Sequence, residues 1–197
     1  MATTAADVRA TTRERILDAM FEAVQDFGLS RTTVEDVAQR AGLSRQTVYR
    51  YFPSKDHLVL ELVLREEEKF IEGTRAAFSS ETDLEVAVER AMAFTLSFAR
   101  EHPLLDRLLA TDTETFLPFL TTRALPVIAR ARDAMVDLIA ERHPHLDPEV
   151  LRGTFDLATR ASLSYIITPS ERPPELVSRT MAQTLVAAIE AAERGAS

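Results

Sequence analysis

The sequence contains no cysteine and no tryptophan, and only five of its 197 residues are glycine. The missing cysteines exclude a disulfide scaffold, a cysteine zinc site and a thiol nucleophile, and they fit the reducing cytosol. No run of about 20 apolar residues is present, as a membrane-spanning helix would need. Residues 1–7 also lack the basic-then-apolar order of a secretory signal. We therefore expect a cytoplasmic protein with no membrane partner.

Acidic side chains outnumber basic ones, 31 against 23, and give the chain a net charge of -8. A net charge of this sign argues against a protein that coats nucleic acid with its whole surface. The excess is uneven, because residues 40–55 contain four basic side chains and no acidic one. This local cationic surface indicates an anionic partner for the N-terminal part of the chain, although charge alone fits a solvated face equally well.

Apolar residues make up 46% of the chain and recur with helical spacing. The first helix is expected over residues 12–27, with an apolar stripe that ends at Phe27, and Gly28 follows where a residue that tolerates positive φ is needed. Further helices are expected over residues 34–41, 45–51, 54–78, 84–101, 104–110, 122–142, 149–167 and 175–193, with another turn near 114–117. The sequence thus predicts an all-α protein of about nine helices. Within it, the run Glu66-Glu67-Glu68 is expected to face water.

Residues 33–51 have the pattern of a helix, a short turn and a second helix. Ala38 is small where two helices must cross closely, Gly42 permits a sharp turn, and Ser44 is a good N-cap for the helix that follows. That short helix is rich in arginine, glutamine, threonine and tyrosine. Arginine reads guanine edges, glutamine reads adenine and the threonine methyl meets thymine, whereas tyrosine and lysine suit phosphate. The pattern therefore indicates a helix-turn-helix whose second helix enters the DNA major groove.

The run from Tyr49 to Leu58, with Thr33, Val37, Ala38, Ala41, Gly42, Leu43 and Ser44, closely resembles the DNA-binding part of the tetracycline-repressor (TetR) family. The resemblance covers about residues 12–60. It implies an all-helical homodimer that binds a palindromic double-stranded DNA operator and encloses a small-molecule effector. By the resemblance, residues 1–53 form the helix-turn-helix domain and residues 54–197 the helical effector-binding and dimerisation domain.

The resemblance also assigns roles in DNA binding. Thr33 and Ser44 would touch phosphate at helix N-termini, and Tyr51 and Lys55 would clamp the backbone. Arg45, Gln46, Thr47 and Tyr49 would face bases or adjacent phosphates. Arg50 occupies a position whose role stays open.

The C-terminal part has more apolar volume than one amphipathic stripe requires, which suggests a cavity for a mostly apolar effector, although each residue alone fits a plain core. The candidate pocket residues are Met92, Phe94, Phe98, Leu105, Leu108, Leu109, Phe116, Leu120, Phe155 and Tyr165. Nearby charged residues, including Arg107 and Asp112, either orient a polar end of the effector or are solvated. An effector that fits only when the helix over residues 54–78 moves would shift the DNA-binding domains out of register.

The last two long helices carry small and apolar residues that suit an isologous four-helix interface between two copies, or else burial by the chain itself. The candidate interface residues are Ala158, Ala161, Ser162, Tyr165, Leu185, Ala188 and Ile189.

The sequence leaves two other function classes to consider: an enzyme and a protein-binding adaptor. An enzyme is not expected, because the sequence has no glycine-rich phosphate loop, nucleophile elbow or His-Glu-x-x-His helix. The pair His143 and His145 flanks a proline and lacks a carboxylate at fixed helical spacing, so neither a metal site nor another cofactor is expected. The remaining alternative is a ligand-sensing helical adaptor that acts through protein partners without operator binding.

Overall fold

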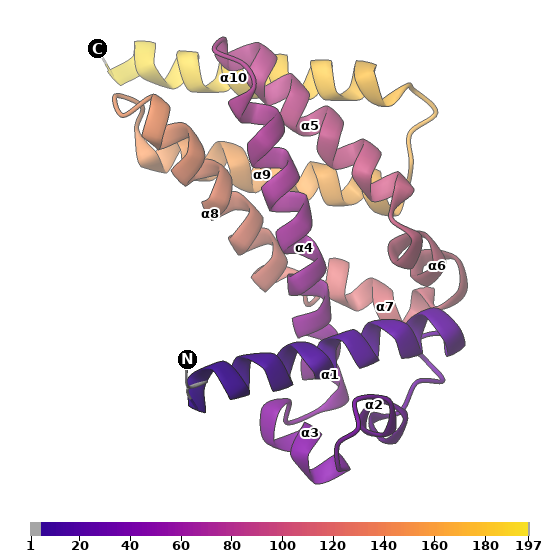
Figure 1. The fold of residues 1–197 in the computed structure, drawn as a ribbon. Coiled ribbons are helices and arrows are strands. Elements are labelled where there is room, and N and C mark those ends of the chain that lie inside the picture. The colour runs from indigo at the N-terminus through magenta and orange to yellow at the C-terminus, as the bar shows by residue number, and fades with distance from the viewer. Residues whose placement is uncertain (1–4, 197) are drawn as a thin grey trace. The chain divides into compact units, whose positions relative to one another are not determined.

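A computed structural model describes residues 5–196 and shows ten helices and no strand among them (Figure 1). The helices are α1 (Ala5–Phe27), α2 (Val34–Arg40), α3 (Arg45–Tyr51), α4 (Lys55–Ser79), α5 (Leu84–Glu101), α6 (Pro103–Thr111), α7 (Thr113–Leu120), α8 (Leu125–Arg142), α9 (Pro148–Ile167) and α10 (Pro174–Ala196). The all-α prediction is confirmed. The count differs by one because the turn expected near residues 114–117 is a full helix, α7, which includes Pro118.

The chain divides into two compact units. The head unit comprises the chain up to Glu66 together with Pro103–Phe119, and the body unit comprises Glu67–His102 and the chain from Leu120 onward. Helix α4 therefore contributes residues to both units. The predicted boundary at residue 53 stays a prediction of domain organisation, whereas these two units describe which segments pack together.

The core of the head unit forms where α1, α2 and α3 meet the start of α4. Ile16, Met20 and Val24 of α1 are buried, as the apolar stripe predicts, and so are Val48 of α3 and Phe52. The stripe is wrong at its last position, because Phe27 is 45% exposed. Gly28 follows it with a φ of +82° and ends the helix, and the Arg40 guanidinium lies 5.5 Å from the Phe27 ring centre.

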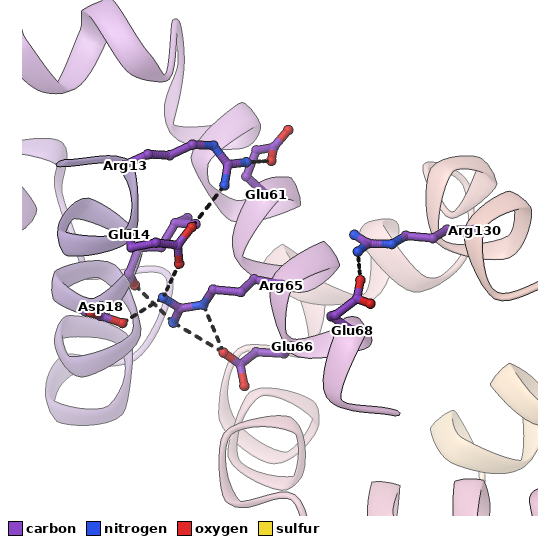
Figure 2. A network of polar contacts seen from close by, with 9 residues as sticks. Arg13, Glu14, Asp18, Glu61, Arg65, Glu66, Glu68 and Arg130 are labelled. Carbon is purple, nitrogen blue, oxygen red and sulfur yellow. Dashed lines mark hydrogen bonds and ion pairs between the residues drawn. The ribbon is translucent and has the colours of Figure 1, made fainter. Parts of the chain in front are cut away.

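Ion pairs join α1 to α4 within the head unit (Figure 2). Arg65 of α4 reaches Asp18 at 2.7 Å, Glu14 at 3.6 Å and its neighbour Glu66 at 3.2 Å. Arg13 pairs with Glu61, which adds a second connection between the same two helices. These contacts bind the first half of α4 to α1.

The expectation that Glu66-Glu67-Glu68 faces water is wrong for two of the three residues. Glu66 is 6% exposed and Glu67 is 8% exposed. Glu66 pairs with Arg65, and Glu68 pairs with Arg130 of α8 in the body unit. Neither carboxylate oxygen of Glu67 has a hydrogen-bond partner among the described residues. Burial raises the pKa of Glu67 to about 8, against a weaker opposing effect of Arg130.

In the body unit, α5 packs along α10 and α8 packs along α9. Their apolar sides and Phe78 of α4 form one continuous core, which includes Ile139, Leu151, Phe155 and Ile189. Arg142 at the end of α8 donates to the carbonyl oxygens of Ser79 at 3.1 Å and Glu81 at 2.8 Å, which satisfies free carbonyls after α4. Among the helices described, none is long and apolar enough to cross a membrane.

Candidate nucleic-acid interface

Helix α2 begins with a complete capping box. The Asp36 amide donates to Thr33 Oγ1 at 3.2 Å, and the Thr33 amide donates to Asp36 Oδ2 at 2.8 Å. The Thr33 hydroxyl also donates to the same carboxylate, and these bonds lower the pKa of Asp36. The exchange satisfies two helix-end donors and fixes where α2 starts. Thr33 therefore lies at the helix N-terminus, where phosphate contact was predicted.

The turn between α2 and α3 is closed by the backbone. Gly42 has a φ of +64°, a conformation that residues with a Cβ rarely adopt, and the Leu43 amide donates to the Ala38 carbonyl at 2.9 Å. A guanidinium nitrogen of Arg15 in α1 caps the Ala41 carbonyl at 2.7 Å. The angle between the two helices is thus fixed by glycine, by a backbone hydrogen bond and by a charged cap.

Helix α3 presents one apolar residue inward and its polar side chains outward. Ser44 accepts the Thr47 amide at 3.1 Å as the N-cap, and Val48 is completely buried. The side chains of Arg45, Gln46, Tyr49 and Arg50 are exposed, with Thr47 and Tyr51 at intermediate exposure. The helix-turn-helix prediction is confirmed at the level of geometry, and the predicted base-reading residues share the outer surface of α3.

Two arginines of α3 lie over tyrosine rings. The Arg45 guanidinium is 5.3 Å from the Tyr49 ring centre and donates to the Tyr49 hydroxyl at 3.3 Å. The Arg50 guanidinium is 5.8 Å from the ring centre of Tyr51. Such stacking orients each guanidinium while its other donors stay available.

Lys55 lies apart from this surface. Its Nζ donates to the Leu29 carbonyl at 2.8 Å, and burial lowers the pKa of Lys55 despite the opposing charge of Asp112. In this conformation the lysine holds the loop before α2. Its predicted role as a clamp on the DNA backbone stays a prediction.

The predicted pocket residues fall in both units. Leu105, Leu108, Leu109 and Phe116 belong to the head unit, and Met92, Phe94, Phe98, Leu120, Phe155 and Tyr165 belong to the body unit. Within the body unit, Met92 and Phe155 are core residues. Phe94 and Phe98 of α5 lie at intermediate exposure, and Phe98 meets Phe70 of α4 edge-on with ring centres 4.5 Å apart. The pocket stays a prediction. The sequence set left out Phe70, which the even apolar spacing of α4 does not distinguish from an ordinary core residue.

The predicted dimer residues differ in accessibility. Ala158, Ser162, Leu185 and Ile189 are buried by their own chain, whereas Ala161 and Tyr165 are half-buried and Ala188 is exposed. The first four pack inside the body unit, so only the last three are available to a second copy.

Among the described residues, no three His, Cys, Asp or Glu side chains gather as potential metal ligands. The ring centres of His143 and His145 are 5.9 Å apart, and His145 lies 3.8 Å from Glu193.

Two family models match this chain. One, described as "Bacterial regulatory proteins, tetR family", matches residues 16–62. The other, described as "Bacterial Tetracyclin repressor, C-terminal domain", matches residues 83–187. The first model covers the second half of α1, all of α2 and α3, and the start of α4. The second covers most of the body unit.

Individual relatives carry related descriptions. HTH-type transcriptional regulator AlkX of Mycobacterium tuberculosis is 26% identical over 165 residues, which are 83% of this chain and 78% of that one. Nucleoid occlusion factor SlmA of Vibrio cholerae is 33% identical over 99 residues, 50% of each chain. The crystal structure of the TetR family repressor AlkX from Dietzia sp. superposes with a TM-score of 0.76 at 26% identity, covering 90% of this chain and 95% of that one.

A glycine turn, a buried valine and an outward cationic helix define a helix-turn-helix DNA-binding protein. The chain belongs to the tetracycline-repressor (TetR) family of bacterial transcriptional regulators.

Proposed function

We propose that this protein is a ligand-responsive repressor that binds a palindromic operator as a homodimer and is released by a small, mostly apolar effector. The observation that carries the proposal is the outer surface of α3, where Arg45, Gln46, Tyr49 and Arg50 are all exposed. Arginine and glutamine supply the bidentate donors that base edges require, and no acidic side chain occurs between residues 40 and 55 to repel phosphate.

A homodimer is supported by exposed stripes without charge on the last two helices. In α10, Leu176, Thr180, Gln183, Thr184 and Ala187 follow helical spacing and are exposed. In α9, Leu157 is 68% exposed and is followed by Ala161 and Ser164 on the same side. Charged residues make up 27% of the chain, so two adjacent stripes that lack them fit burial against a second copy. The proposed interface therefore consists of these exposed residues of α9 and α10. It leaves out the predicted interface residues that are buried, Ala158, Ser162, Leu185 and Ile189.

The effector class is inferred from aromatic side chains and from one relative. Phe70, Phe94 and Phe98 form a half-buried aromatic group in the body unit. The Dietzia AlkX repressor, at 26% identity, is described as implicated in biodegradation of n-alkanes. We infer that compounds with a long aliphatic chain are the first effectors to test. Because α4 supplies residues to both units, its displacement is the expected route to the DNA-binding surface.

The proposal is tested by a gel shift with the DNA upstream of the protein's own gene, over a series of salt concentrations. A repressor of this kind binds that DNA more tightly than a shuffled duplex, and its affinity falls steeply with salt. Dodecanoate, dodecan-1-ol and palmitoyl-coenzyme A are the effector probes, each expected to release DNA if it is accommodated. Equal affinity for the two duplexes would favour the alternative, a ligand-sensing adaptor that acts through protein partners.

A further inference from the structure

The loop between α1 and α2 is held by three charged side chains that come from other segments. Arg107 belongs to α6, Asp112 lies between α6 and α7, and Lys55 begins α4. All three belong to the head unit with the loop they hold. The DNA-binding element is therefore packed together with a segment some 80 residues away in the sequence.

Arg107 caps the C-terminus of α1. Its guanidinium donates to the carbonyl oxygen of Gln25 and, at 3.3 Å, to that of Asp26. The last carbonyls of a helix have no partner within the helix and carry its partial negative charge, so a cation at this position is stabilising. A movement of α6 would therefore pull directly on the end of α1.

Asp112 holds the residues that follow. It is 6% exposed, and its Oδ1 accepts the Ser30 amide at 2.9 Å while Oδ2 accepts the Thr111 hydroxyl at 3.1 Å. Burial acts to raise the pKa of Asp112, but hydrogen bonds from Ser30, Thr111 and the Leu29 amide outweigh it and keep the pKa below its ordinary value. The buried carboxylate is thus charged, and it binds the loop through the Ser30 amide.

Gly28 makes room for that carboxylate. Its φ of +82° suits glycine, and a Cβ at this position would lie 2.7 Å from Asp112 Oδ2. Thr32 closes the same loop by donating its hydroxyl to the Gly28 carbonyl at 2.7 Å, one residue before the Thr33 N-cap of α2. The loop leads without a flexible spacer into the helix-turn-helix.

We propose that Arg107 and Asp112 form a clamp that couples the α6–α7 segment to the DNA-reading surface. The inference rests on the proposed function, because Leu105 and Leu109 of α6 are also among the residues predicted to face the effector. A shift of α6 that opens the clamp leaves the α1 carbonyls and the Ser30 amide unpaired and frees α2 and α3 to reorient. Within the head unit, the clamp holds the loop before α2 together with Lys55, which donates to the Leu29 carbonyl.

Coupling between sites is reciprocal, so the clamp is testable without an effector. Hydrogen–deuterium exchange is measured on the full-length protein with and without saturating operator DNA. Operator binding is expected to slow exchange in peptides covering residues 103–119, which belong to α6 and α7 and not to α3. Asp112→Ala is expected to abolish that slowing, whereas Asp137→Ala, an exposed aspartate of α8, retains it.

Operator affinity gives the second readout. Arg107→Ala and Asp112→Ala are expected to weaken operator binding about tenfold, because each removes the side chain that holds backbone groups at the end of α1 or in the loop after it. Arg100→Ala, at an exposed position of α5, is expected to have no effect. Asp112→Asn keeps an acceptor for the Ser30 amide, so it is expected to fold and to show intermediate affinity. Unchanged exchange at residues 103–119 in the wild-type complex, or wild-type behaviour of Asp112→Asn and Asp112→Ala, would overturn the clamp. If the wild-type protein binds its upstream DNA no more tightly than a shuffled duplex, the proposed function is contradicted, and not the clamp alone.

Discussion

At the scale of single residues, the polar side chains of the head unit fall into two groups. One group binds backbone groups at helix ends, and the other is exposed on α3 and available to DNA. Thr33, Ser44 and Arg15 satisfy helix ends, and each would leave an unpaired backbone group if removed. Gln46 and Arg50 occupy exposed positions on α3. Substitutions in the first group are expected to reduce stability, and substitutions in the second to reduce recognition.

Glu67 leads to a prediction about pH. Its pKa of about 8 in the folded chain exceeds the ordinary value of 4.5, so the folded state holds this proton more tightly than the unfolded state. The resulting stabilisation is complete below pH 4.5 and is lost as the pH rises through about 8. In the wild type, ionisation of Glu67 is expected to lower the free energy of unfolding by up to about 1.4 kcal/mol per pH unit between pH 4.5 and about 8. Glu67→Gln cannot ionise, so this contribution to the slope is expected to disappear.

Urea unfolding at a series of pH values measures this slope. Glu72→Gln, at an exposed position further along α4, serves as the control and is expected to keep the wild-type slope. An identical pH dependence for wild type and Glu67→Gln would show that burial does not retain the proton.

At the scale of elements, local signals predicted the helix-turn-helix well. Ser44 and Gly42 act within one turn of themselves, so their roles follow from the sequence. Contacts between residues far apart in the sequence could not be predicted from it. Glu66 is buried beside Arg65, which itself pairs with Asp18 of α1. Asp112 accepts a hydrogen bond from Ser30, 82 positions away in the sequence. Neither the residue types nor their spacing predicts these contacts. Arg107 and Asp112 were accordingly expected to face an effector or water, whereas in the structure both hold the end of α1 and its loop.

Glycine positions in two helices give contrasting expectations. A Cβ on Gly73 of α4 would overlap the Phe94 ring of α5, whereas a Cβ on Gly153 of α9 would meet nothing within 4 Å. Gly73→Ala is therefore expected to lower the unfolding free energy by about 1–3 kcal/mol through overpacking. Gly153→Ala is expected to raise it by about 0.5–1 kcal/mol, because alanine is the better helix former. Denaturant unfolding of both variants checks the pair, and equal shifts would contradict the close approach of α4 and α5.

At the scale of the whole molecule, the charge distribution fits binding by one surface. The chain is acidic overall, with a net charge of -8, while residues 40–55 carry only positive charge. Long-range repulsion from the rest of the chain favours approach to DNA through α3. A single recognition helix typically contacts few base pairs, so the proposed repressor requires a second copy for adequate affinity and for reading a palindrome.

The proposed dimer surface is tested with two equally exposed leucines. Leu157 of α9 is 68% exposed and lies in the uncharged stripe, whereas Leu125 of α8 is 67% exposed and lies outside it. Leu157→Glu is expected to weaken self-association at least tenfold (about 1.4 kcal/mol or more) and to weaken operator binding with it. Leu125→Glu is expected to change neither. Light scattering after gel filtration measures the mass, and a dimeric Leu157→Glu protein would place the interface elsewhere.

The most direct measurement compares operator recognition by the wild type and by the double variant Arg45→Ala/Tyr49→Ala. Fluorescence anisotropy gives the affinity for upstream operator DNA and for a shuffled duplex of equal length, with Arg172→Ala as an exposed arginine control. Recognition by α3 predicts that the double variant loses about 1–3 kcal/mol of the preference for operator over shuffled DNA, while Arg172→Ala keeps it. A double variant that still prefers the operator as strongly as the wild type would contradict recognition by α3.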